Sequence, residues 1–177
     1  MDERAKNLVY RALLTALCTV ATMSIPIPTP TGGYLNAGDI IVVLAALLAG
    51  PYSGAIISGF GSALADLFLG YTIYAPGTFV AKAAAAFLIG RLFAAAKKQQ
   101  IHTAAAAAVS GELLMVVIYF VYASLALGFG LGAAADLPGD LMQGAVGVVG
   151  GVLLYHALIR IPQVRAFSQE AYKKHKK

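Results

Sequence analysis

Long apolar runs, separated by short polar or glycine- and proline-rich stretches, dominate this 177-residue chain. A helix that crosses about 30 Å of hydrocarbon needs about 20 largely apolar residues. The runs predict six transmembrane helices, near residues 8–25, 38–50, 54–71, 77–96, 103–128 and 139–159. The second run is the shortest and ends at Gly50 and Pro51, so we expect a tilted or partly sheltered helix there.

The composition agrees with a protein that is embedded in a membrane. Hydrophobic residues make up 59% of the chain and charged residues 12%, against about 45–50% and 25% in soluble domains. The first apolar run is followed by several others, which favours a retained helix over a cleaved signal peptide. Cys18 has no second cysteine to pair with. We therefore expect one all-α integral membrane domain over residues 1–177.

The positive charges predict the orientation. All thirteen Lys and Arg except Lys82 lie near the N-terminus, near residues 91–98 or near the C-terminus. Because Lys and Arg gather in cytoplasmic segments, both termini are expected in the cytoplasm, in a plasma membrane of bacterial type. The outward connections would then be residues 26–37, 71–76 and 129–138. Aromatic residues do not alternate with the basic ones, so no nucleic-acid partner is expected.

The first outward connection has the composition of a lid. Three prolines at alternate positions hold the backbone extended, and Gly32 and Gly33 allow a sharp turn after them. A plain connector is the alternative interpretation. Asp39 follows at the start of the next helix, where we expect it to cap free backbone amides, with ligand contact as a second role.

Outside the basic clusters, the ionisable residues singled out within or at the edge of the predicted helices are Asp39, Asp66, Lys82 and Glu112. At about 1.5 Å per residue, all four fall between the midplane and the outer surface. Ionisable groups are costly in a bilayer and mark functional sites. The cluster predicts a pocket open to the outside, in which Asp66, Lys82 and Glu112 neutralise one another or hold a polar ligand. A network that only joins helices is the alternative.

Tyrosines and amides add to this cluster and suit a small, flat heterocycle. The candidate substrate-binding residues are Tyr34, Asn36, Asp39, Asp66, Tyr71, Tyr74, Lys82, Glu112, Tyr119 and Gln143. The chain has no phosphate-binding loop, zinc-protease or serine-hydrolase motif. We therefore expect no enzyme, catalytic residue, metal or cofactor. A self-contained channel or carrier, or an intramembrane enzyme using Asp66 and Glu112, stays open as an alternative.

Three stretches carry a resemblance to a known family: "RALLTAL", "LNAGDIIVVLAALLAGPYSGAIISGFGSALADLFLGY" and "YAPGTFVAKAAAAFLIG". With the six apolar runs, they make nearly the whole chain similar to the substrate-binding S components of energy-coupling factor (ECF) vitamin importers. The resemblance implies a six-helix bundle that binds a vitamin or precursor in its outer half. A transmembrane coupling (T) protein and two cytoplasmic ATPases would then deliver the substrate inward.

The resemblance also implies a coupling surface and a substrate class. Ala12 and Ala16 match the A-x-x-x-A face that S components present to the T protein. Within this family, the chain resembles the subgroup that transports pyridoxine-like vitamins or hydroxymethylpyrimidine. Riboflavin, biotin, pantothenate, folate and queuosine-type substrates stay open at this point. The absence of tryptophan counts against the stacking arrangement of the thiamine binders.

Overall fold

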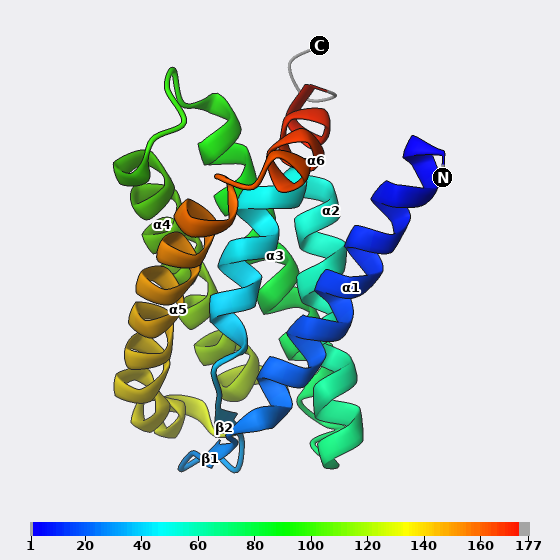
Figure 1. Cartoon of the computed structure of the whole chain (residues 1–177). Coiled ribbons are helices and arrows are strands. Elements are labelled where there is room, and N and C mark those ends of the chain that lie inside the picture. The colour runs from blue at the N-terminus through cyan, green and yellow to red at the C-terminus, as the bar shows by residue number, and fades with distance from the viewer. Residues whose placement is uncertain (1, 174–177) are drawn as a thin grey trace.

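The computed structural model describes residues 2–173 and shows helices packed around α2 (Figure 1). The elements in chain order are α1 (Glu3–Ser24), β1 (Ile27–Pro28), β2 (Tyr34–Leu35), α2 (Gly38–Leu69), α3 (Ala75–Ala95), α4 (Ile101–Val121), the π-helix η1 (Tyr122–Ala126), the 3-10 helix η2 (Gly130–Asp136), α5 (Leu137–Leu158) and α6 (Pro162–Lys173). α2 packs against α1, α3, α5 and α6. The predicted all-α class is confirmed, with a short hairpin added to it.

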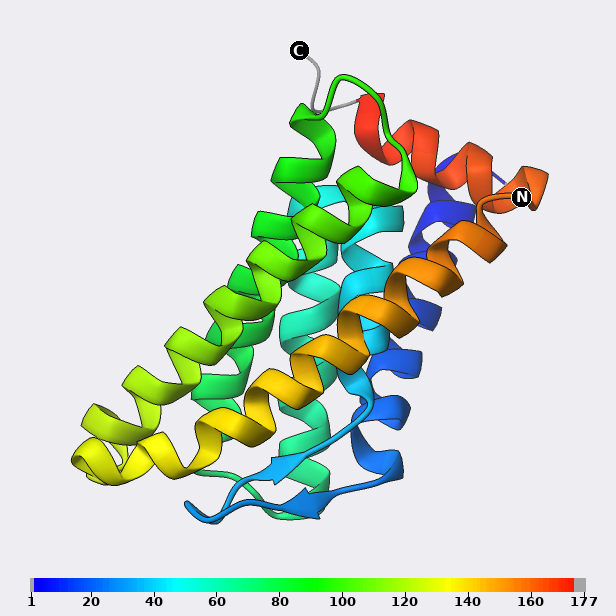
Figure 2. The ribbon, with the colours of Figure 1, turned by 90° about the vertical axis from the view of Figure 1, so that its left-hand side faces the viewer.

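α2 reverses its direction at Gly50. Gly50 has a φ of 76°, which favours glycine, and Pro51 has no backbone N–H to continue the helical hydrogen bonds. The chain therefore runs from the hairpin to Gly50 and returns along residues 51–69 (Figures 1 and 2). The two runs predicted near 38–50 and 54–71 thus form the two halves of α2, with the break between them at the predicted place.

Four helical segments in the described chain are long and apolar enough to cross a membrane. They are Asp39–Leu69, Ala75–Ala95, Ile101–Ala126 and Gly130–Leu158. Large apolar side chains such as Phe68 and Leu153 are exposed on their sides, as lipid contact requires. The predicted count of six spans needs α1 in addition and counts α2 twice, so it stays a prediction.

The irregular parts of the fold were not predicted. The run expected over 103–128 ends as an α-helix at Val121 and continues as the π-helix η1. The 12-residue helix α6 is also additional, and it lies across one end of the bundle. There the Tyr172 hydroxyl donates to the backbone oxygen of Ala46 (2.8 Å), in the last turn before the break at Gly50.

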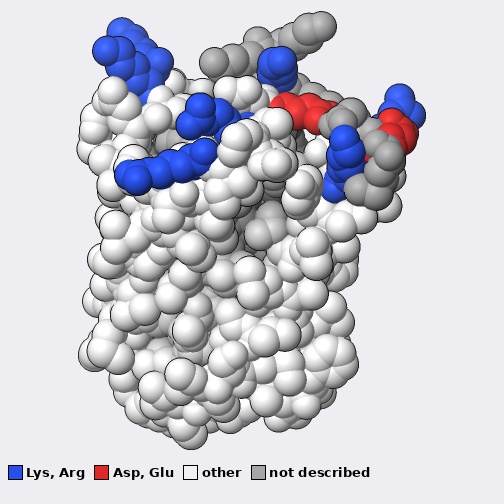
Figure 3. Space-filling model, viewed as in Figure 1, with Lys and Arg blue, Asp and Glu red and all other residues white. Residues whose placement is uncertain are grey.

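Charge divides the bundle into two ends. The start of α1, the connection between α3 and α4, and α6 share one end, which we call the basic end; the opposite end is the hairpin end (Figure 1). On the face seen in Figure 3, all coloured charges lie at the basic end. The exposed Lys97 and Lys98 belong to it. The acidic groups of the hairpin end are largely turned inward, which directs attention to its interior.

Candidate substrate-binding site

A pocket lies at the hairpin end, between the hairpin and the helices next to it. Six of the predicted substrate-binding residues line it: Tyr34, Asn36, Asp66, Tyr74, Tyr119 and Gln143. Its volume is ≈ 40 Å³, and a single water molecule needs about 10–15 Å³ on this measure. In this conformation the pocket is therefore nearly filled by its own side chains.

The hairpin covers this pocket, and we call residues 26–37 the lid hairpin. The sequence predicted a stiff arm followed by a hinge, whereas the structure shows paired strands, with Ile27 opposite Leu35. Thr29 N–H donates to Gly33 O (2.9 Å) across the turn, where Gly32 has a φ of 82°. Glycine adopts this left-handed conformation without steric cost. The predicted turn residues thus close a hairpin.

Side chains from three other elements tether the lid hairpin. The hydroxyls of Thr29 (3.1 Å) and Thr31 both donate to the Asp136 carboxylate at the end of η2. The Tyr74 hydroxyl, just before α3, donates to the backbone oxygen of Thr31. Asn36 N–H donates to Gln143 Oε1 of α5 (2.7 Å). These bonds hold the hairpin closed over the pocket.

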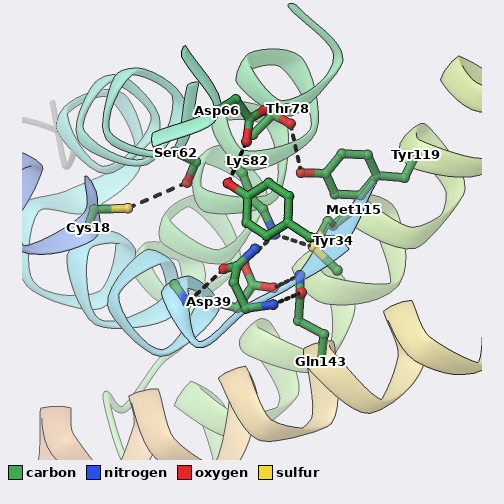
Figure 4. Close-up of polar contacts among 12 residues, drawn as sticks. Cys18, Tyr34, Asp39, Ser62, Asp66, Thr78, Lys82, Met115, Tyr119 and Gln143 are labelled. Atoms are coloured by element: carbon green, nitrogen blue, oxygen red, sulfur yellow. Dashed lines mark hydrogen bonds and ion pairs between the residues drawn. The ribbon is translucent and has the colours of Figure 1, made fainter. Parts of the chain in front are cut away.

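Tyr34 connects the lid hairpin to Asp66. Its hydroxyl donates to Asp66 Oδ1 (2.6 Å) (Figure 4). Its ring packs on Tyr71 with a centroid distance of 4.6 Å. Burial, and then the hydrogen bond to Asp66, raise the pKa of Tyr34 far above its usual value. The hydroxyl therefore stays protonated and available as a donor.

Below the pocket lies a fully connected group that we call the ionic floor, made of Asp39, Lys82, Met115 and Gln143. Lys82 Nζ lies 2.5 Å from Asp39 Oδ1 and 2.8 Å from Met115 Sδ. Gln143 Nε2 donates to Asp39 Oδ2 (2.6 Å). Asp39 and Lys82 are each 1% exposed. Both oxygens of Asp39 thus have partners, which a buried carboxylate needs.

The ionic floor corrects two sequence predictions. Asp39 was expected to cap α2, but that helix has no side-chain cap, and the Asp39 carboxylate faces Lys82 and Gln143 instead. Asn36 Oδ1 accepts the free N–H of Gly38. Lys82 was expected to neutralise Asp66 and Glu112, but its salt bridge is with Asp39. Depth along a helix does not determine which way a side chain points around it.

Only one of the two carboxylate oxygens of Asp66 accepts a hydrogen bond of standard geometry. Its Oδ1 accepts from Tyr34, whereas the buried Oδ2 has no hydrogen bond of standard geometry, although the Thr78 hydroxyl lies close enough to interact with it. Thr78 in turn accepts from the Tyr119 hydroxyl (3.2 Å) (Figure 4). Asp66 is 2% exposed. The pocket therefore contains a carboxylate oxygen with spare accepting capacity.

Glu112 does not line this pocket. Its side chain belongs to a separate groove between α4 and α5. It is 3% exposed, and neither carboxylate oxygen has a hydrogen-bond partner within the described chain. The predicted cluster of four ionisable residues is thus split into a pair, Asp39 with Lys82, and two separate carboxylates.

Several pocket residues were missed by the sequence analysis. Asp136 and Asp140 both line the pocket, four residues apart around Pro138, and Thr31 and Thr78 join them. Asp136, in a connection without Lys or Arg, was a usable signal, whereas Asp140 lies just inside the run predicted as a helix over 139–159. The threonines carried no signal, because an isolated hydroxyl in a loop or helix is common.

Comparisons with known proteins show the family to which the chain belongs. The family model described as "ECF-type riboflavin transporter, S component" matches residues 3–160. An uncharacterized protein of Pyrococcus woesei is 37% identical over 139 residues, which cover 77% of this chain and 91% of that protein.

Two solved structures share the fold, each at 20% sequence identity. The S component of a bacterial ECF transporter has a TM-score of 0.72 over 89% of this chain and 98% of its own. The S component for biotin from an ECF-type ABC transporter has a TM-score of 0.66 over 95% and 99%. These relatives are transport subunits and not enzymes, as predicted. Because the family model covers residues 3–160, the chain belongs to the family of ECF-type transporter S components.

Proposed function

We propose that this S component captures a small vitamin or vitamin precursor from outside the cell and delivers it inward with a T protein and two ATPases. The observation that carries the proposal is the pocket beneath the lid hairpin. Its tyrosine rings offer flat apolar faces, and Asp66, Asn36 and Gln143 offer directional polar groups. This combination is typical of small-molecule sites.

The charge distribution supports the orientation that this function needs. The basic end would face the cytoplasm because Lys and Arg gather there, which places the lid hairpin outside. Counting α1, the two halves of α2, α3, α4 and α5 gives six spans and puts both termini in the cytoplasm. The membrane would be the plasma membrane of a prokaryotic cell.

The dimensions of the pocket favour a substrate with a single ring. With the lid hairpin closed, ≈ 40 Å³ is free, so a ligand enters only when the hairpin and the tyrosines move. A pyridoxine-like or hydroxymethylpyrimidine ring needs the smallest movement. Riboflavin is the second candidate because the matched family model carries its name.

Nine of the ten predicted residues have a proposed role in this scheme. Asp66 accepts a ligand hydroxyl or ring N–H, Tyr74 and Tyr119 face the ring, and Asn36 and Gln143 complete the polar contacts. Tyr34 and Tyr71 close above the ligand. Asp39 and Lys82 position Gln143 from below. Contact between Glu112 and the vitamin stays a separate prediction, since this side chain lies in the other groove.

The T protein would contact the face of α1 that points away from the rest of the bundle. Ala12 and Ala16 are exposed there, and small side chains four residues apart let a second helix approach closely. We expect Ala12→Leu with Ala16→Leu to abolish uptake while substrate binding in detergent is kept. Uptake at the normal rate in this double variant would disprove the proposed coupling face.

The function is tested by titrating the purified protein in detergent with pyridoxine, hydroxymethylpyrimidine, riboflavin and biotin in a calorimeter. Saturable binding of one compound, together with copurification of a T protein and two ATPases from the native host, is the expected result. If none of these compounds binds and no ATPase copurifies, a self-contained channel or carrier becomes the better interpretation.

A further inference from the structure

A second cavity lies on the side of the bundle, between α4 and α5, and we call it the α4–α5 groove. These two helices are in front in Figure 2. The cavity has a volume of ≈ 270 Å³. Valine and leucine side chains form most of its walls, and the exposed Leu113 and Val149 lie on the flank that would face lipid.

Glu112 is the one ionisable residue among those that line the α4–α5 groove. It is 3% exposed, and both of its oxygens lack partners in the part of the chain that the structure describes. The opposite wall has no side chain at Gly144, where an added Cβ would lie 3.6 Å from Glu112 Oε2. The groove therefore reaches the carboxyl group without obstruction by a side chain at this position.

No cation of the ionic floor is free to neutralise Glu112. The nearby Lys82 donates to Asp39 at 2.5 Å and to Met115 at 2.8 Å. Glu112 lies about 16 Å along α4 from Ile101, close to the middle of a hydrocarbon layer about 30 Å thick. A carboxylate at this depth is costly without a proton or a cation. A ligand that brings a cation would satisfy it.

We propose that the α4–α5 groove binds an apolar molecule with a single amine, which enters from the hydrocarbon layer and places its ammonium group on Glu112. The hydrocarbon part of the ligand lies along Val109, Leu113, Val116 and Val148. Charge complementarity distinguishes this occupant from a lipid acyl chain, which fills the space and leaves both oxygens of Glu112 unpaired. The inference goes beyond the proposed function because the groove is separate from the pocket beneath the lid hairpin.

The test uses dicyclohexylcarbodiimide, an apolar reagent, on the full-length protein in lipid nanodiscs. The Glu112 carboxyl adds across one C=N bond: its oxygen binds the central carbon, its proton moves to nitrogen, and acyl migration gives a stable N-acylurea. No group leaves, so the peptide gains the mass of one reagent molecule. Labelling at Glu112, and its loss in Glu112→Gln, is the expected result. Absence of labelling at Glu112 in the wild type would overturn the proposal.

Protection from labelling identifies the ligand class. N,N-dimethyldodecylamine cannot add to the reagent and is compared with dodecan-1-ol, which has the same chain but no charge. A charge-assisted hydrogen bond should make the amine slow labelling about tenfold more than the alcohol does. Equal protection by the two compounds would mean that the groove accepts any hydrocarbon chain and would overturn the proposal.

Variants of the groove separate this inference from the proposed function. Ala145→Phe fills the groove from α5 and should remove the protection by the amine, while vitamin binding beneath the lid hairpin is kept; Val149→Trp repeats the test if the first variant does not fold. Full amine protection in a folded filled-groove variant would contradict the proposal. A tenfold loss of vitamin affinity in Glu112→Gln would assign Glu112 to the vitamin site instead.

Discussion

Asp39 and Asp66 lie in the two halves of α2, are both almost completely buried, and differ in how well they are satisfied. Asp39 has Lys82 on one oxygen and Gln143 on the other. Asp66 has Tyr34 on one oxygen and no standard hydrogen bond on the second. A buried carboxylate with all its partners stabilises a structure, whereas one with an unfilled position can accept a ligand. The comparison assigns a structural role to Asp39 and a binding role to Asp66.

The largest expected effect comes from breaking the ionic floor. Lys82→Met leaves the Asp39 carboxylate buried without its cation, so the free energy of unfolding should fall by about 3–5 kcal/mol. Thermal unfolding in detergent measures this loss of stability. The double variant Asp39→Asn with Lys82→Met should recover most of the loss, and Lys97→Met at the basic end should cost almost nothing. Equal stability of Lys82→Met and the wild type would contradict the structural role.

The second largest effect is a loss of ligand affinity when the charge of Asp66 is removed. Asp66→Asn keeps the shape of the side chain but removes the charge that would receive a ligand hydroxyl or N–H. Affinity should fall by about 10- to 100-fold, the contribution of a hydrogen bond to a charged group, while the unfolding temperature changes little. Calorimetric titration with the tightest-binding vitamin checks it. Collapse of the fold with unchanged affinity in the surviving protein would give Asp66 the structural role.

The smallest effect is expected at the tethers of the lid hairpin. Asp136→Asn weakens the hydrogen bonds from Thr29 and Thr31, each contributing about 1 kcal/mol. The ligand should then dissociate about 3- to 10-fold faster, because the closed hairpin is less stable. Stopped-flow displacement measures this rate, with Thr103→Val at the basic end as the control. An unchanged dissociation rate would mean that these tethers do not hold the hairpin closed over the ligand.

The sequence was sufficient for the helical class and for six of the residues that line the pocket, for physical reasons that are easy to name. Apolar runs locate helices in a membrane, and Gly50 with Pro51 marked the reversal of α2. Depth counting placed Asp39, Asp66, Lys82 and Glu112 between the midplane and the outer surface. It could not tell which carboxylate pairs with Lys82, because that depends on the rotation of each helix about its axis.

Other features depend on tertiary contacts that no local pattern carries. The lid hairpin formed by β1 and β2 is tethered by Asp136, Tyr74 and Gln143 from distant parts of the chain. α6 is short and polar. Its buried Phe167 packs on Tyr10 of α1, and its buried Tyr172 packs on Phe93 of α3 and donates to Ala46 of α2. Glu112 lies on the side of α4 that faces the α4–α5 groove, and counting depth along the helix could not predict that side.

Native mass spectrometry of the purified protein tests the central claim most directly. The wild type, incubated with the tightest-binding vitamin, should carry one small molecule. Glu170→Gln, which alters an acidic residue at the basic end, should carry the same molecule, and Asp66→Asn should lose it. Retention of the ligand by Asp66→Asn at the level of the wild type would contradict the assignment of Asp66, and with it the proposed pocket.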